Sequence, residues 1–334
     1  SITTVATNTD GTLLARGDST GRILLTVGNA PPTTLLAHSG PISGIAILKD
    51  AKSLLTSGAD GHVRMWTPSK SPRVSFPQHA GPLQVIAATT DGKIVATGTS
   101  GGTLRLISTE TGKPTRLLEG LAGPTTSASW SGNGSRLVAG NGKGQVAIWD
   151  TNNGKLLGIH GTHGSAVTGV ALHPDGKRLL TAGADGTWKI WTLPLPLPTA
   201  GGDKKSQKKP EPIKPLVMVT AHSGGVHSLA ISADGNQVLT GGADKTARLY
   251  AIGGQLVRTL TGHTGPVRAV GFTSTHTVAA GDDKTVRAWA RNNGAVGPVL
   301  TLPAAVVSLS ANSKTQRIAA GLSDGSLQVI DLAA

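Results

Sequence analysis

Short runs of apolar and β-branched residues alternate with turn-forming residues along the whole chain. In one typical stretch, residues 41–48, 53–58, 62–67 and 72–77 are rich in Val, Ile, Leu or Thr, and Gly, Asp, Ser and Pro occur at and between their ends. Runs of five to eight such residues predict β-strands, and no stretch shows sustained helical periodicity. The pattern therefore predicts an all-β protein built from units of four short strands.

The four-strand unit is repeated at a regular spacing. Clear copies of one segment occupy residues 59–66, 184–191, 243–250 and 282–289, and weaker copies end at Thr26, Ile107, Trp149 and Ile330. The last residues of the eight copies lie 40, 41, 42, 42, 59, 39 and 41 residues apart. A period of this length is typical of a repeat protein in which each unit packs against its neighbours.

Three landmarks recur in phase: a His before the first strand, an Asp in the tight turn after the second strand, and a Trp ending the third. In one unit the Trp is followed directly by Asp, as Trp149-Asp150, and in one unit the His is preceded directly by Gly, as Gly262-His263. The chain thereby resembles the WD-repeat family of β-propellers, in a divergent, bacterial-type form. The resemblance implies an all-β propeller of eight blades, each a four-stranded antiparallel sheet, with seven blades as the rival. Unit eight stops after its third strand, so its blade is expected to be three-stranded or completed from outside the chain.

Residues 1–334 are predicted to form one propeller. The 59-residue gap contains an insertion, residues 194–214, with alternating Leu and Pro followed by a Lys-rich run. Such a segment cannot pack as a strand, so it is expected to be an exposed Lys/Pro-rich insertion within blade 5. The chain begins with Ser, which suggests a processed or cut N-terminus.

Composition narrows the function classes. The 334 residues include no Cys, which excludes disulfides, thiolate metal sites and Cys nucleophiles within this chain. No apolar run approaches the roughly 18 residues of a membrane helix, so no membrane span is expected. The formal net charge is +13, which suggests an acidic partner such as nucleic acid, anionic lipid or an acidic protein surface.

Units two and five carry a complete set of His, Thr, Asp and Trp at fixed spacing. A hydroxyl, an imidazole and a carboxylate could suggest a hydrolase triad. The resemblance implies instead that these residues form a buried structural hydrogen-bond chain, and a set repeated in several units fits that role because an enzyme needs one site. Units one, three, four and eight lack much of the set and are expected to rely on apolar packing. The two full sets are His38, Thr56, Asp60, Trp66 and His163, Thr181, Asp185, Trp191.

No catalytic, cofactor or metal site is predicted. His160 and His163 are three residues apart, but His163 belongs to the repeat and no third ligand stands near them in the sequence. Gly140 to Gly144 is glycine-rich but lacks the Lys-Ser/Thr pair of a phosphate loop.

The excess positive charge gathers in one class of loop. The turns between first and second strands and between third and outer strands share one face of a propeller. With the insertion, they hold twenty bases and ten acids, and the rest of the chain holds eleven and eight. We call this the basic face; Asp-Gly-Lys turns chosen for solubility are its simpler explanation. Its leading candidates are Lys49, Lys52, Lys70, Arg73, Lys93, Arg116, Lys177, Arg178, Lys204, Lys205, Lys208 and Lys209.

The resemblance implies a non-catalytic protein–protein interaction platform, as a module or subunit of a larger assembly. One alternative is a module that assists an enzyme or a haem-bearing electron-transfer partner, because similar propellers occur in large, often exported, bacterial multidomain proteins. That context favours an exported or periplasmic protein over a cytoplasmic one. The other alternative is anion or nucleic-acid binding through the basic face, against which stands the scarcity of aromatic residues for base stacking.

Overall fold

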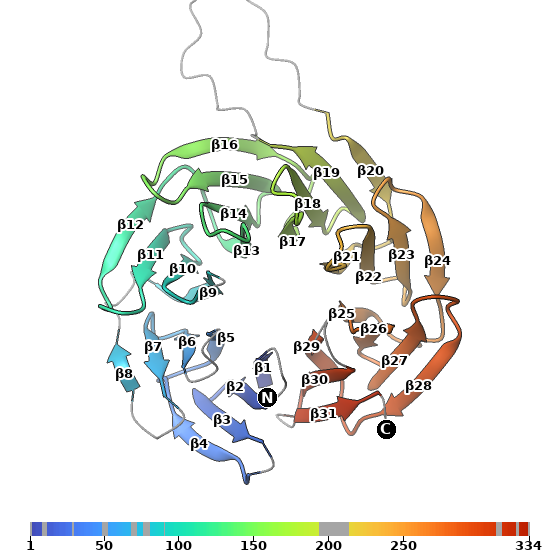
Figure 1. The fold of residues 1–334 in the computed structure, drawn as a ribbon, viewed down its shortest axis with the longest axis horizontal. Helices are drawn as coiled ribbons and strands as arrows, with labels where there is room; N and C mark the ends of the chain where they lie inside the picture. The colour runs from blue at the N-terminus through green and yellow to red at the C-terminus, as the bar shows by residue number, and fades with distance from the viewer. Residues whose placement is uncertain are drawn as a thin grey trace, which may run out of the picture.

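The computed structural model contains 31 β-strands arranged in eight sheets around a central axis (Figure 1). It describes residues 2–8, 12–28, 30–48, 53–67, 72–75, 81–89, 91–193, 214–311, 316–324 and 327–332. Within these ranges there is no α-helix, and accordingly none that could cross a membrane. Each sheet is one blade of a propeller, and its strands follow chain order from the axis outward.

The first four blades occupy the blue-to-green half of Figure 1. Blade 1 contains β1 (Ile2–Thr7), β2 (Leu13–Asp18), β3 (Arg22–Val27) and β4 (Thr33–Leu36). Blade 2 contains β5 (Ile42–Ile47), β6 (Leu54–Gly58), β7 (Val63–Trp66) and β8 (Pro72–Ser75). Blade 3 contains β9 (Leu83–Ala88), β10 (Ile94–Thr99), β11 (Leu104–Ser108) and β12 (Pro114–Leu118). Blade 4 contains β13 (Thr125–Trp130), β14 (Arg136–Asn141), β15 (Gln145–Asp150) and β16 (Leu156–Gly161).

The remaining blades complete the ring. Blade 5 contains β17 (Val167–Leu172), β18 (Arg178–Gly183), β19 (Thr187–Thr192) and β20 (Val217–Thr220). Blade 6 contains β21 (Val226–Ile231), β22 (Gln237–Gly242), β23 (Ala247–Ala251) and β24 (Leu256–Leu260). Blade 7 contains β25 (Val267–Phe272), β26 (His276–Gly281), β27 (Thr285–Ala290) and β28 (Val296–Thr301). Blade 8 contains β29 (Val306–Ala311), β30 (Arg317–Leu322) and β31 (Leu327–Asp331).

The polar turn residues determine where the strands end. In blade 3, Asp91 accepts hydrogen bonds from the Thr89 hydroxyl (2.6 Å) and the Lys93 backbone N–H (3.1 Å). Gly92 has a φ of 72°, a left-handed conformation that glycine adopts without steric cost. Antiparallel strands joined in this way place alternate turns at opposite ends of each sheet, so the turns of the basic face lie on one side of the ring.

Blades pack on one another through small residues of their second strands. A Cβ added to Gly140 of β14 would lie 2.5 Å from Val167 at the start of β17 in the next blade. Gly321 of β30 plays the same part against β1, since its Cβ would lie 2.4 Å from Val5. Contacts of β1 with β29 and β30 thus close the ring between the last blade and the first.

The eight predicted blades are confirmed, and the seven-bladed alternative is wrong. The strands of blade 2 lie within one or two residues of their predicted positions. In the described part of the chain, the eighth sheet has three strands, β29 to β31. The predicted insertion at 194–214 lies, apart from residue 214, outside the described residues.

Candidate functional site

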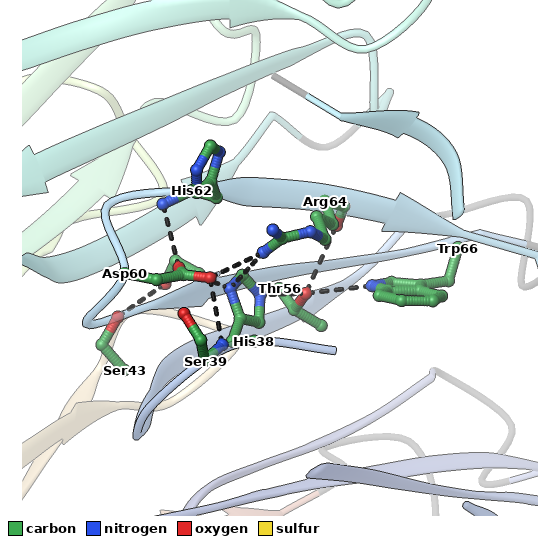
Figure 2. A network of polar contacts seen from close by, with 9 residues as sticks. His38, Ser39, Ser43, Thr56, Asp60, His62, Arg64 and Trp66 are labelled. Atoms are coloured by element: carbon green, nitrogen blue, oxygen red, sulfur yellow. Dashed lines mark hydrogen bonds and ion pairs between the residues drawn. The ribbon is translucent and has the colours of Figure 1, made fainter. Parts of the chain in front are cut away.

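Figure 2 shows the blade 2 network, a continuous chain of hydrogen bonds from an indole to a carboxylate. Trp66 Nε1 donates to Thr56 Oγ1 (3.0 Å), and Thr56 Oγ1 lies 2.8 Å from His38 Nε2. His38 Nδ1 lies 2.8 Å from Asp60 Oδ1. With Nδ1 donating to the carboxylate, Nε2 is free to accept the threonine proton, so a neutral imidazole fits the chain from Trp66 to Asp60. Arg64 Nη1 also lies 2.7 Å from His38 Nδ1, beside the carboxylate oxygen to which Arg64 donates.

The network ties three separate segments of blade 2 together. His38 lies in the loop before β5, Thr56 lies on β6 and Trp66 ends β7. Asp60, in the turn between β6 and β7, also accepts from the Ser39 and His62 backbone N–H groups. Its second oxygen accepts from Arg64 at 2.9 Å. The network therefore anchors the loop before β5 and the β6–β7 turn to the sheet.

Blade 5 repeats this arrangement. His163 Nε2 lies 2.8 Å from Thr181 Oγ1, and His163 Nδ1 lies 3.0 Å from Asp185 Oδ1. Trp191 Nε1 donates to Thr181 at 3.0 Å. The threonine hydroxyl has no exposed surface and gives its proton to the imidazole, so no substrate could reach it. The order of hydroxyl, imidazole and carboxylate is also that of a catalytic triad. Burial of the hydroxyl and repetition of the set in blade 6, and not the hydrogen-bond geometry, identify it as a structural support.

Blades 6 and 7 contain incomplete versions. In blade 6, His222 bonds to both Thr240 and Asp244 at 2.8 Å, with Tyr250 in the tryptophan position. In blade 7, His263 Nδ1 lies 2.8 Å from Asp283 Oδ2, and Ala279 stands where the threonine would be. His263 Nε2 therefore lacks the threonine hydroxyl that Nε2 meets in the other three blades, although the Thr285 hydroxyl lies 3.2 Å from His263 Nδ1.

In other blades, polar residues whose role was not predicted from the sequence occupy a position beside the network site. The position occupied by Gly58, Gly183 and Gly242 in blades 2, 5 and 6 is Asp18, Thr99 and Asn141 in blades 1, 3 and 4. A Cβ at the three glycines would lie 2.6, 2.4 and 2.2 Å from the adjacent His ring, so a ring and a side chain cannot share that space. The expectation that blades 1, 3 and 4 rely on apolar packing alone is wrong in this respect.

Asn141 illustrates the replacement in blade 4. Its buried amide accepts from the backbone of Lys143 (3.0 Å) and Gln145 (2.9 Å), and it donates to the Ala122 carbonyl (2.8 Å). The tryptophan of this blade, Trp149, donates to the Glu119 carbonyl at 2.8 Å. A signal was present in the sequence, because Gly is the last residue of the second strand in blades 2, 5, 6 and 7, whose His lies in a described network.

The networks have a pH dependence with a defined sign. Burial lowers the pKa of His38, His163, His222 and His263, and this outweighs the raising influence of their aspartates. Burial alone would raise the pKa of Asp60, but hydrogen bonds from His38, the His62 backbone and Arg64 hold it at about 2. The imidazoles are therefore neutral and the carboxylate is charged at neutral pH.

We expect the free energy of unfolding to fall as the pH drops below about 6.5. In that range the histidines of the unfolded chain become protonated, whereas the network histidines of the folded protein, whose pKa is lowered, stay neutral. Each such proton contributes a slope of up to about 1.4 kcal/mol per pH unit. A second loss follows below about pH 4, where the unfolded aspartates become protonated while Asp60 stays ionised. Urea unfolding at a series of pH values measures both stages, and a constant free energy between about pH 7 and 5 would contradict the first.

The two histidines near the start of blade 5 have different partners. His163 belongs to the network, whereas the ring of His160 packs edge-on against Trp191 with centroids 5.5 Å apart. Within the described ranges, no group of three or more His, Asp and Glu side chains is placed to hold a metal ion.

The structure describes part of the predicted basic face. Lys93, Arg116 and Lys177 are exposed, and Arg178 is half-buried and donates to Asp175 at 2.8 Å. Arg73 lies in β8, of which only the backbone is described. Outside the described residues lie Lys49, Lys52, Lys70, Lys204, Lys205, Lys208 and Lys209.

An eight-bladed β-propeller with buried histidine networks is the class of protein that this fold defines. The family model described as WD domain, G-beta repeat matches residues 29–67, 112–150, 154–192, 213–251 and 254–290. The chain belongs to the WD-repeat family, whose members are typically non-catalytic scaffolds.

Similar curated proteins carry the same repeats within longer chains. The nuclear distribution protein nudF of Aspergillus niger is 27% identical over 167 residues, covering 47% of this chain and 37% of nudF. The human serine-threonine kinase receptor-associated protein is 28% identical over 156 residues, covering 46% of this chain and 39% of that protein. The matches thus span well under half of these relatives. The similarities fit a protein–protein interaction platform.

A solved structure shares the fold over nearly the whole chain. The crystal structure of the computationally designed Ika8 protein superimposes with a TM-score of 0.83 at 22% identity. It covers 98% of this chain and 95% of that one. This likeness supports the propeller architecture alone.

Proposed function

We propose that this chain is a non-catalytic module of a larger assembly, which binds an acidic protein partner through the basic face. The observation that carries the proposal is the excess of positive side chains on that side of the ring. Its described acids are Asp91, Glu110, Asp150, Asp175, Asp234 and Asp331. Its described bases are more numerous: Lys93, Lys113, Arg116, Arg136, Lys155, Lys177, Arg178, Lys214, Arg258, Arg291 and Arg317. All of these bases are exposed or half-buried.

The aromatic residues favour a protein partner over a single-stranded nucleic acid. Among the described residues, Trp130 is half-buried and every other Trp, Phe and Tyr is buried. Single-stranded nucleic acids are bound largely by stacking their bases on exposed aromatic side chains. A basic surface without such platforms suits the carboxylates of a protein partner.

Charge reversal on each face of the ring tests the proposal. Lys93, Lys155 and Lys177 are exposed on the basic face, and Lys143, Lys245 and Lys284 are exposed in turns on the opposite face. Changing either trio to Glu alters the net charge equally. With a fluorescent poly-glutamate peptide as probe, the basic-face variant should lose binding and the opposite-face variant should retain it. Equal losses would contradict the proposal, and preferential binding of a DNA duplex would favour a nucleic-acid partner instead.

A further inference from the structure

Blade 7 has a shortened turn on the basic face. In blade 6, residues 232–236 connect β21 to β22, whereas in blade 7 only residues 273–275 connect β25 to β26. The network histidine and aspartate lie 22 residues apart in blades 2, 5 and 6 but 20 apart in blade 7. Two residues are therefore missing from this turn, and with them the Asp-Gly pair.

In other blades the turn glycine packs against the preceding blade. A Cβ on Gly92 would lie 3.2 Å from Leu48, and the Gly235 carbonyl lies 3.0 Å from His173 Nε2. Blade 7 has no such glycine, and a cleft of about 610 Å³ lies between blades 6 and 7 at this point. The corresponding cleft between blades 3 and 4, where the turn has its full length, measures about 450 Å³. Pockets of about 300–1,000 Å³ are the usual size for ligand recognition.

Arg291 contacts the neighbouring blade, unlike the residues at its position in blades 3 and 4. The equivalent residues Thr109 and Thr151 donate their hydroxyl protons to the glycine carbonyls of their own turns, at 2.8 and 2.7 Å. Blade 7 offers no turn glycine, and Arg291 crosses to blade 6, where its Nη2 donates to Gln237 Oε1 at 3.3 Å. Its guanidinium carbon lies 5.2 Å from the centroid of the Phe272 ring. Contacts on two sides thus hold the guanidinium in place within the cleft.

The guanidinium keeps donors for a ligand. The nearby Asp234 directs its carboxylate to its own turn, where hydrogen bonds from the Ser232 hydroxyl and the Asn236 backbone lower its pKa. The charge of Arg291 adds a smaller lowering influence on the pKa of Asp234. In the part of the chain that the structure describes, Arg291 forms no ion pair within 4 Å of a carboxylate. Asn292, exposed at the same cleft, adds an amide. A held guanidinium is the side chain best suited to pair with a carboxylate through two parallel hydrogen bonds.

We propose that the cleft between blades 6 and 7 binds a carboxylate side chain from an acidic segment of the partner protein, with Arg291 as its counter-ion. The proposal rests on the proposed function, since it places one specific contact within the basic face. The segment lies along the cleft, and its acidic side chain enters between the shortened turn and Gln237.

A set of three peptides tests the site directly. The probes are a fluorescein-labelled peptide of alternating Glu and Gly, the same peptide with Gln for Glu, and one with Lys for Glu, measured by fluorescence polarisation. Arg291→Gln removes the charge while keeping a hydrogen-bonding side chain. Arg116→Gln is the matched control, because Arg116 is an exposed arginine of the same face. Among the described residues, its guanidinium donates to the backbone carbonyls of Thr115 and Asn152. Ser274→Trp, which fills the cleft, is a second variant that leaves the charge unchanged.

The wild-type protein should prefer the Glu peptide, and Arg291→Gln should weaken its binding by about tenfold or more, as expected for loss of a charge-assisted pair. Ser274→Trp should have a similar effect and Arg116→Gln less than about a twofold effect. Equal losses for both arginine variants, or a preference for the Lys peptide, would overturn the cleft as a site while leaving the basic face intact. No binding of the Glu peptide by the wild-type protein would overturn the basic-face function as well. Thermal unfolding of each variant separates lost binding from lost folding.

Discussion

Replacing Trp149 with alanine is expected to destabilise the protein by about 3–5 kcal/mol, the usual cost of truncating a buried aromatic residue. Trp149 has no exposed surface and packs among Leu104, Leu118 and Leu137 at the junction of blades 3 and 4. Blade 4 has Leu121 and Lys143 where other blades place the network His and Asp. Its third strand is held instead by packing around Trp149 and by the hydrogen bonds of Asn141 and Trp149. Chemical denaturation measured by tryptophan fluorescence and circular dichroism gives the loss.

Two further variants separate packing from hydrogen bonding at this position. Trp149→Phe keeps most of the ring but leaves the Glu119 carbonyl without its donor, and should cost less than the alanine variant. Val296→Ala, at a side chain that is 70% exposed, should change stability by no more than about 0.5 kcal/mol. If Trp149→Phe were as damaging as Trp149→Ala, the hydrogen bond and not the packing would be the main contribution.

The repeat made the fold predictable because each blade uses the same local chemistry. Asp91 and Gly92 form the same kind of turn as Asp234 and Gly235, and turns of this kind mark strand ends without reference to the rest of the chain. Counting third strands then gave the number of blades. The pairing of His38 with Asp60 was implied by the resemblance to WD-repeat propellers, and the same spacing of 22 residues recurs in blades 5 and 6.

Features that depend on the space between neighbouring side chains were beyond the sequence pattern. The sequence shows Leu121 at the His position of blade 4 and Asn141 in place of the strand-end Gly. The hydrogen-bond partners of Asn141, however, become evident only when the loop before β13 is placed against β14. The cleft at Arg291 has a similar origin, since it depends on what the missing turn residues of blade 7 would have filled. Its traces in the sequence are the 39-residue spacing between units six and seven and the missing Asp-Gly pair.

The network aspartates should contribute to stability according to the completeness of their networks. Asp60→Ala would leave the His38 imidazole and the Ser39 and His62 backbone donors without their acceptor. Asp185→Ala would do the same to His163 and Gly164 in blade 5. An unsatisfied buried polar group costs about 1–3 kcal/mol, so we expect losses of that size and similar to each other.

Asp324 supplies the internal comparison, because it occupies the same turn position in blade 8 without the rest of the set. Leu302, Ala320 and Ile330 stand at the His, Thr and Trp positions of that blade, and Asp324 itself is exposed. Asp324→Ala should therefore cost clearly less than the other two substitutions in urea unfolding at neutral pH. Asp60→Asn, which retains an oxygen acceptor for the imidazole, should fall between wild type and Asp60→Ala. An equal loss at all three aspartates would mean that turn geometry alone accounts for their contribution, since turn geometry is the one feature that the three positions share.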